Sequence, residues 1–210
     1  SSDLLEKRSI ENSKKHQQPA TLNVKSNLDK LTLNNMQVFR FNFRHEKNQK
    51  ILYLHGGYNT LQPSPFHWRL LDKLTLNTLH EVVLPIYPKS PDYHYLETFK
   101  AIRDVYNQLV EEVGASNIVM MGDGSGGGLA LSFVQSLIND NQEVPRKLFL
   151  LSPLLDATLT NPNITKTLEE NDILVSRFGV HQLMKSWTND LPLSDARISP
   201  LYGTLKGLPP

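Results

Sequence analysis

The sequence predicts an α/β fold built on a doubly wound, mostly parallel sheet. Short apolar runs, of the length and β-branched character of buried strands, alternate with longer segments whose apolar residues recur every three or four positions. Glycine-rich turns follow two of these strands directly. Strands that alternate with helices pair in parallel and bury both faces, so we expect helices on each side of the sheet.

An antiparallel hairpin is predicted at the start of the sheet. Residues 29–33 and 37–43 flank Asn34-Asn35, a pair that tolerates the positive φ of a hairpin turn. In the second run, phenylalanines alternate with polar residues such as Arg40, so we expect only one buried face there.

The remaining elements follow in alternation, and two segments stand apart from them. Apolar runs and helical periodicity predict strands at 50–54, 82–86, 117–121 and 147–151, and helices at 66–76, 96–113 and from 129 onwards. Residues 1–28 begin with a polar segment, and we expect a weakly ordered extension or a cap. Residues 156–195 lack the alternation and predict a cap-like insertion in a domain that covers residues 29–210.

Composition excludes several functional classes. A net charge of +1 indicates neither nucleic acid nor an anionic membrane as partner. The chain has no cysteine, which excludes disulfides, thiolate metal sites and cysteine nucleophiles. No apolar run is long enough to span a membrane, and we expect a cytoplasmic protein. We expect no metal or cofactor, and no feature of the sequence predicts an oligomeric state.

The segment Gly122–Gly128 is the predicted working site, because it joins a buried strand to a helix without a spare residue. Two interpretations compete. The spacing of Gly122, Gly124 and Gly127 fits G-x-G-x-x-G, the dinucleotide fingerprint, whereas a serine on a strand-to-helix turn is typical of a nucleophile elbow. Asp123 disfavours the first interpretation, since a carboxylate beside the glycines would repel a pyrophosphate.

The combination of motifs is more specific than this turn alone. The chain resembles the hormone-sensitive-lipase-like branch of the α/β-hydrolase superfamily, a family of carboxylesterases. That family carries H-G-G-G after its third strand, D-Y-R-L-A-P-E after its fourth, G-D-S-A-G-G at its elbow and S-P-x-x-D after its sixth. The resemblance extends over residues 29–210, and the matching segments here are His55–Tyr58, Ile86–Asp92, Gly122–Gly127 and Ser152–Asp156.

The resemblance implies an α/β-hydrolase fold with helical cap segments and hydrolysis of a small-molecule carboxylic ester. It implies that the N–H groups of Gly56, Gly57 and Ser125 bind the oxyanion of the reaction. His55 and Asp123 would support the two turns. The resemblance also implies that the family's catalytic Asp and His come from strands after Pro210, so we expect an incomplete domain.

The chain departs from the family at the elbow itself. Gly124 stands at the family's nucleophile position, and Ser125 follows one place later. Ser125 is then a helix N-cap or an oxyanion N–H donor, or, if the elbow has slipped by one residue, the nucleophile. The alternative function is a non-catalytic protein that keeps the pocket and binds a small molecule; dinucleotide binding is the less favoured third hypothesis.

Overall fold

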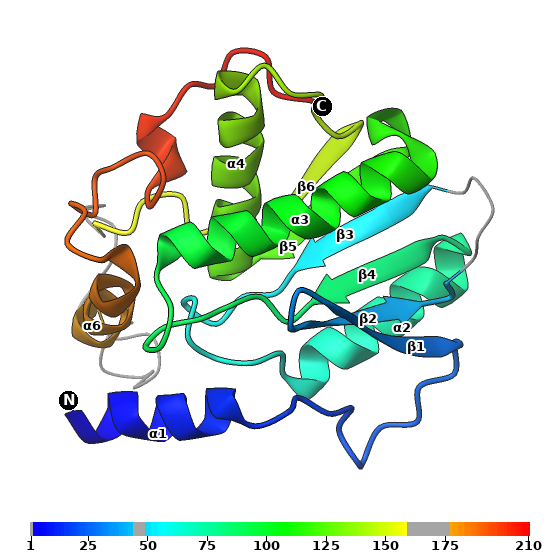
Figure 1. Ribbon diagram of the computed structural model, residues 1–210, viewed down its shortest axis with the longest axis horizontal. Helices are drawn as coiled ribbons and strands as arrows, with labels where there is room; N and C mark the ends of the chain where they lie inside the picture. Colours follow the sequence, from blue (N-terminus) through cyan, green and yellow to red (C-terminus); the bar gives the residue numbers. More distant parts are fainter. Residues whose placement is uncertain (1, 44–48, 159–176) are drawn as a thin grey trace.

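The computed structural model of the chain describes residues 2–43, 49–158 and 177–210, and within them a six-stranded mixed sheet (Figure 1). Its strand order is β1-β2-β4-β3-β5-β6. The strands predicted from the sequence are confirmed within one or two residues at each end. Their bounds are β1 Leu28–Leu33, β2 Met36–Phe41, β3 Lys50–Leu54, β4 Glu81–Pro85, β5 Ile118–Asp123 and β6 Lys147–Leu151.

The sheet combines an antiparallel edge with a parallel centre. β1 and β2 form the predicted hairpin, and Asn34 and Asn35 have φ angles of 48° and 65° at its turn. β2 also pairs antiparallel with β4, whereas β4, β3, β5 and β6 are parallel to one another. The prediction of a mostly parallel sheet is therefore confirmed.

Helices cover both faces of this sheet, as a doubly wound fold requires. α3 and α4 lie on one face and α2 lies on the other (Figure 1). Leu52, Met120 and Phe133 belong to the first core layer, and Ile51 and Trp68 belong to the second. The helices are α1 Ser2–Ser13, α2 Pro65–Thr78, α3 Tyr95–Val113, α4 Gly124–Asn139 and α6 Arg177–Thr188.

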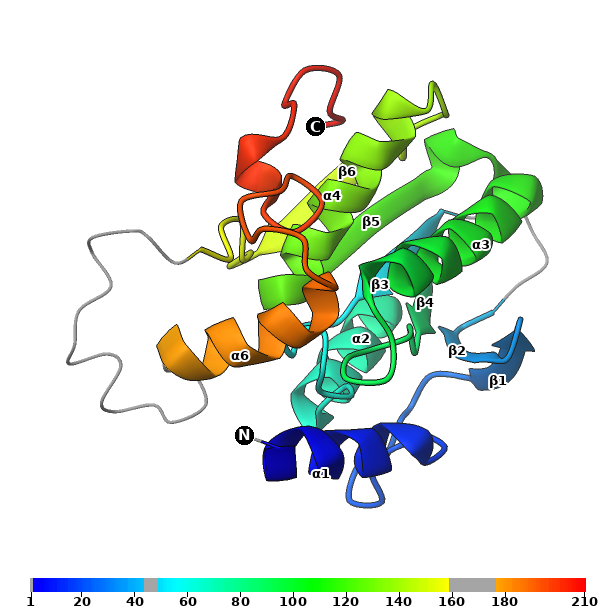
Figure 2. The ribbon, with the colours of Figure 1, turned by 60° about the vertical axis from the view of Figure 1, so that its left-hand side comes forward.

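The polar N-terminal segment, expected to be a weakly ordered extension or a cap, begins with a helix and is held in place by tertiary contacts. α1 lies at the same end of the molecule as α6 (Figures 1 and 2). The side chain of Asn12 donates hydrogen bonds to the carbonyl groups of Thr60 and Ser90, at 2.9 and 3.0 Å. Farther along, the ring of His16 stacks on Trp68 with the ring centroids 5.8 Å apart.

The predicted cap-like insertion is seen only in part, since residues 159–176 lie outside the described residues. α6 packs against the body of the fold through Met184 and Trp187, both of which are buried. The indole N–H of Trp187 donates to the hydroxyl of Thr98 on α3 at 3.0 Å. Within the described ranges, no helix has the length and apolar character needed to cross a bilayer.

Arg40 is buried, although the alternation in its strand predicted a polar outer face. Its guanidinium pairs with Glu81 and Glu112, each at 2.5 Å, and Lys50 pairs with the same two carboxylates, at 2.7 and 2.5 Å. Two positive and two negative groups thus neutralise one another, which is the condition under which charged side chains are tolerated in a protein interior.

Candidate functional site

Two turns lie side by side at the carboxyl ends of β3 and β5. These strands are parallel neighbours, and Leu54 at the end of β3 pairs with Gly122 in β5. The turns pack so closely that a Cβ on Gly126 would lie 2.1 Å from the carbonyl oxygen of Leu54, so only glycine fits there. The carboxyl ends of parallel strands are where open α/β sheets bind ligands.

The apex of the second turn is Gly124. Its φ is +53°, in the left-handed region, whereas Ser125 is not among the residues with positive φ. A Cβ placed on Gly124 would meet no atom within 4 Å, so a side chain there would project into open space. A strained apex that presents its side chain freely is the geometry of a nucleophile elbow.

Ser125 is not the helix N-cap that its position suggested, because the N-cap of α4 is Asp123. Ser125 instead lies in the first turn of the helix, where its side chain is buried. Its hydroxyl oxygen accepts a hydrogen bond of 2.7 Å from the backbone N–H of Tyr58. This bond connects the two turns, because Tyr58 stands at the third-glycine position of the loop after β3.

Asp123 joins the same two turns from the other side. Its carboxylate accepts hydrogen bonds from the hydroxyl of Tyr53 at 2.6 Å, the backbone N–H of Gly56 at 3.0 Å and the Nε2 of His67 at 2.9 Å. Burial raises the pKa of this carboxyl, but the hydrogen bonds from His67, Tyr53 and Gly56 outweigh it, and the pKa lies below its ordinary value. Asp123 is therefore an ionised brace between the turns.

Gly56, expected to supply an oxyanion donor, has its N–H engaged in this structure. It donates to the carboxylate of Asp123 at 3.0 Å. Gly57, with a φ of +128°, and Tyr58, with a φ of +56°, continue the turn toward Ser125.

His67 is a site residue that sequence reasoning missed. Its Nδ1 accepts the backbone N–H of Ser64 at 2.9 Å, so its proton is placed on Nε2, which donates to Asp123. The available signal was the serine three residues before His67 with proline between them, the pattern of a helix start. Burial raises the pKa of Tyr53, the other missed donor, so its hydroxyl keeps its proton.

His55, which was expected to support the first turn, lies beneath it and makes its contacts there. It is completely buried, and its Nδ1 lies 2.8 Å from the carbonyl oxygen of Gly56. Its ring stacks on Tyr87 with a centroid distance of 4.7 Å, and the Tyr87 hydroxyl donates to the His55 carbonyl at 2.5 Å. Burial holds the pKa of His55 well below its ordinary value, so the ring is uncharged.

The glycines of the second turn serve packing. A Cβ on Gly122 would lie 2.5 Å from the carbonyl oxygen of Gly126, and one on Gly127 would lie 3.0 Å from the Cβ of Pro153. These contacts hold the start of α4 against β5 and the loop after β6. With the Asp123 carboxylate also at the turn, the arrangement does not favour the dinucleotide hypothesis.

A small hollow of about 10 Å³ lies beside Ser125, between the elbow and α6. It has room for about one water-sized group. Its lining is mostly apolar, with Leu129, Met184 and Trp187 beside the polar Asn59 and Arg197. Across the described part of the chain, no three His, Asp or Glu side chains are grouped so that they could hold a metal ion.

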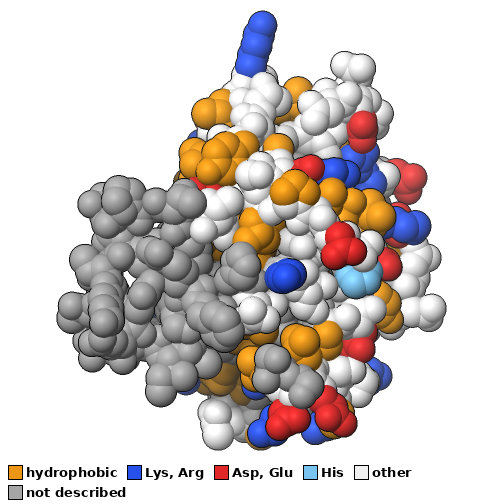
Figure 3. Space-filling model, turned by 90° about the vertical axis from the view of Figure 1, so that its left-hand side faces the viewer, with side chains coloured by type: hydrophobic (Ala, Val, Ile, Leu, Met, Phe, Trp, Pro, Cys, Tyr) orange, Lys and Arg blue, Asp and Glu red, His pale blue; other side chains and the backbone are white. Residues whose placement is uncertain are grey.

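On the face toward which α1 and α6 lie, the described side chains show no dominant charge (Figure 3). In Figure 3 its described side chains show separate hydrophobic groups, with acidic and basic residues interspersed. Such a surface differs from the single-sign basic patch of nucleic-acid-binding proteins.

Comparison with known proteins gives the same family in each case. A family model described as the alpha/beta hydrolase fold matches residues 51–210. The chain is 31% identical over 180 residues to a triacylglycerol lipase of Mycobacterium tuberculosis, covering 85% of this chain and 36% of that protein. It is 35% identical over 164 residues to an esterase of Acinetobacter venetianus, covering 77% of this chain and 54% of that protein.

Solved structures agree with these matches. A crystal structure described as that of a candidate esterase from Staphylococcus aureus covers the whole chain, with a TM-score of 0.94 and 64% identity; the chain covers 71% of it. An esterase of the bacterial hormone-sensitive lipase family has a TM-score of 0.80 at 20% identity, covering 99% of this chain and 75% of that one, which speaks for the fold alone. The chain thus spans about a third to a half of its curated relatives.

Proposed function

Because the chain belongs to the α/β-hydrolase fold family, in its hormone-sensitive-lipase-like esterase branch, we propose that the full-length protein is a carboxylic ester hydrolase with an impaired nucleophile elbow. The observation that carries this proposal is the junction of the two turns, where Tyr58 N–H lies 2.7 Å from the Ser125 hydroxyl beside the open apex at Gly124.

The binding part of the reaction would fall to backbone N–H groups. We assign the oxyanion site to the N–H groups of Gly57 and Ser125, since the N–H of Gly56 is engaged by Asp123 and that of Tyr58 by the Ser125 hydroxyl. Donors fixed by a folded backbone stabilise the negative charge of a tetrahedral intermediate without reorganisation, which makes them effective in ester hydrolysis. His55 and Asp123 then act as positioning residues that hold the two turns together.

The nucleophilic part of the reaction is where this chain departs from its family. Glycine has no hydroxyl, so Gly124 cannot form the covalent acyl intermediate that a serine forms at an elbow. An enzyme that loses its nucleophile retains a small residual rate from oxyanion stabilisation and binding. We therefore propose slow turnover of small esters.

The test is hydrolysis of one activated ester, p-nitrophenyl acetate, by the full-length protein and two variants at the apex. Gly124→Ser adds the hydroxyl and Gly124→Ala adds only the Cβ, so both carry the same backbone strain at φ +53°. We expect Gly124→Ser to raise kcat/KM by about 100-fold or more, while Gly124→Ala stays at the wild-type level.

Other results would lead to different functions. Fast wild-type hydrolysis that is abolished by Ser125→Ala would make Ser125 the nucleophile. No hydrolysis by Gly124→Ser, together with saturable binding of the ester's acid product, would support the non-catalytic binding protein. The cytoplasmic location expected from the sequence stays a prediction, which cell fractionation would test.

A further inference from the structure

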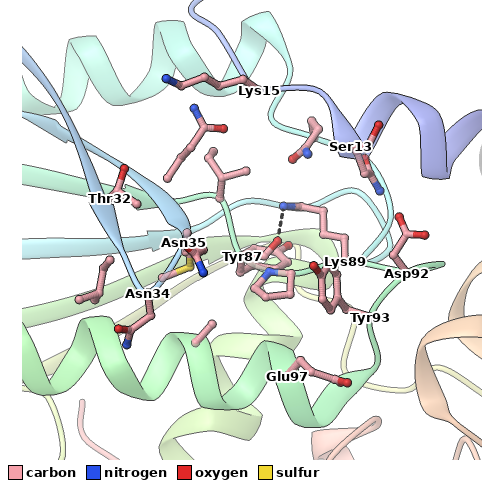
Figure 4. A pocket seen from close by; sticks show the side chains of 18 of the residues that line it. Ser13, Lys15, Thr32, Asn34, Asn35, Tyr87, Lys89, Asp92, Tyr93 and Glu97 are labelled. Atoms are coloured by element: carbon pink, nitrogen blue, oxygen red, sulfur yellow. Dashed lines mark hydrogen bonds between the residues drawn. The ribbon is translucent and has the colours of Figure 1, made fainter.

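A second and much larger cavity lies away from the elbow. This cleft has a volume of about 920 Å³ and is bordered by the segment after α1, the β1–β2 turn and α3 (Figure 4). It shares no lining residue with the hollow beside Ser125. The lining residues used in the argument below are Lys15, Thr32, Asn35, Tyr87 and Lys89.

Lys89 lines this cleft although it is only 3% exposed. Its side-chain amine donates to the carbonyl oxygen of Tyr87 at 2.7 Å and lies 4.1 Å from the centre of the Tyr87 ring. Among the residues that the structure describes, no carboxylate forms an ion pair with it. In Figure 4 the amine points away from Asp92 and Glu97.

The carboxylates at the rim of the cleft are engaged elsewhere. Asp92 accepts the hydroxyl of Ser9 at 2.7 Å, and Glu97 accepts the backbone N–H of His94 at 3.0 Å. Asp104 pairs with Lys100 at 2.9 Å. None of these contacts supplies the negative charge that a buried ammonium requires.

The nearby titratable groups do not supply it either. His16, on the segment after α1, and His55, at the end of β3, both have a lowered pKa, that of His16 about 4, and burial is the main cause in each case. Both rings are therefore neutral near pH 7. Burial likewise lowers the pKa of Lys89 well below its ordinary value. The interior of the cleft thus contains one basic group and no compensating acid in the described residues.

The family motif has an apolar residue at the position of Lys89. In the stretch Ile86–Asp92, which matches the family's D-Y-R-L-A-P-E, Lys89 stands at the leucine position. A leucine would fill this buried site at no electrostatic cost, whereas a lysine without a counter-charge destabilises the fold. A ligand that brings the missing charge would offset this cost.

We propose that the cleft binds a small molecule through an anionic oxygen group, a carboxylate or a phosphate, that pairs with Lys89. The polar side chains of Lys15, Thr32 and Asn35 line the same cleft and supply further hydrogen-bond donors. This site is separate from the oxyanion site and does not depend on the proposed ester hydrolysis.

The test measures thermal unfolding of the full-length protein with sodium butyrate or sodium phosphate, against sodium chloride at equal ionic strength. The variants are Lys89→Leu, which restores the family's residue, and Lys100→Leu, which removes an exposed lysine from the rim of the same cleft. We expect one anion to raise the Tm of the wild type and of Lys100→Leu, but not that of Lys89→Leu. The responding anion identifies the group as carboxylate or phosphate.

A second measurement covers the case in which Lys89→Leu does not fold. Titration of the lysine side chains by NMR follows Lys89 directly in the wild-type protein, and a bound anion raises its pKa because it stabilises the charged form. The proposal is overturned if neither butyrate nor phosphate changes the Tm and the Lys89 titration, or if a folded Lys89→Leu responds as the wild type does.

Discussion

The hydroxyl oxygen of Ser125 accepts the backbone N–H of Tyr58 at 2.7 Å, so a side chain from the elbow helix occupies a donor of the neighbouring turn. In the family motif G-D-S-A-G-G the residue at this position is alanine, which has no hydroxyl to accept this hydrogen bond. Under the proposed function, the serine therefore occupies a donor that would otherwise bind the ester. This contact has separate consequences for stability and for activity.

For stability, Ser125→Ala removes the hydroxyl that accepts the Tyr58 N–H. We expect a loss of about 1–3 kcal/mol in the free energy of unfolding, the usual cost of an unsatisfied buried donor. Urea unfolding measures it. Ser13→Ala is the control, because the exposed Ser13 hydroxyl donates to the Ile10 carbonyl of its own helix; an equal loss in both variants would contradict the assignment.

For activity, the same substitution should act in the opposite direction once a nucleophile is present. In the Gly124→Ser background, Ser125→Ala frees the Tyr58 N–H to stabilise the oxyanion, so we expect kcat/KM to rise several-fold on p-nitrophenyl acetate. The rise should appear in kcat more than in KM, since the donor acts on charge that develops in the transition state. A decrease in kcat would show that the Ser125 hydroxyl assists the reaction.

Asp123 and His67 should be energetically coupled. Asp123→Asn places an amide N–H₂ opposite the Nε2–H of His67, and His67 cannot reverse its proton because Nδ1 accepts the Ser64 N–H. We expect Asp123→Asn to cost about 2 kcal/mol and His67→Phe to remove part of that cost in the double variant. A double-mutant cycle by urea unfolding checks this, and strict additivity would argue against a direct contact.

The elbow was the part of the site most accessible from sequence, because glycine spacing and strand-to-helix order restrict the backbone strongly. The position of Gly124 at a strained apex follows from that pattern. The partners of Asp123 could not be foreseen in the same way. Tyr53 and His67 come from a buried strand and a helix start, where their residue types are equally typical of a core, and only the packing of α2 brings them to the carboxylate.

The elements of the fold were predictable because their apolar periodicity reflects burial directly. Two features of the fold could not be predicted for the same physical reason: local composition does not indicate which residues will be in contact in the folded chain. The alternation in its strand places Arg40 on the exposed face, whereas in the structure it is buried because it pairs with Glu81 and Glu112. The polar N-terminal segment has the composition of a weakly ordered extension. In the structure it is held in place by contacts such as the hydrogen bonds from Asn12 to two backbone carbonyls far along the chain.

The buried ion-pair cluster predicts a specific dependence of stability on acid. Hydrogen bonds and charges from Arg40 and Lys50 outweigh burial and lower the pKa of Glu112 from 4.5 to about 2. A carboxyl whose pKa is lowered by folding stabilises the protein above its unfolded pKa, and this contribution is lost as the pH falls through the folded pKa. We therefore expect wild type and Glu112→Gln to differ most in stability above pH 4.5 and to converge near pH 2.

Urea unfolding at several pH values measures this convergence, and Glu111→Gln is its control. Glu111 precedes Glu112 on the same helix but is exposed, so its substitution should change stability little at any pH. A constant difference between wild type and Glu112→Gln across this range would contradict the prediction.

The last prediction concerns the outer strand β6. Phe149 and Leu151 project on the same face of this strand and are 47% and 40% exposed, whereas β3 and β4 are buried along their whole length. Exposed apolar side chains at a sheet edge are a template for association. We expect the 210-residue chain to self-associate with rising concentration and Phe149→Lys to reduce this, as measured by analytical ultracentrifugation. Leu76→Lys, a change at a 42% exposed leucine on α2, should not reduce it; an equal effect of both variants would show that added charge alone is responsible.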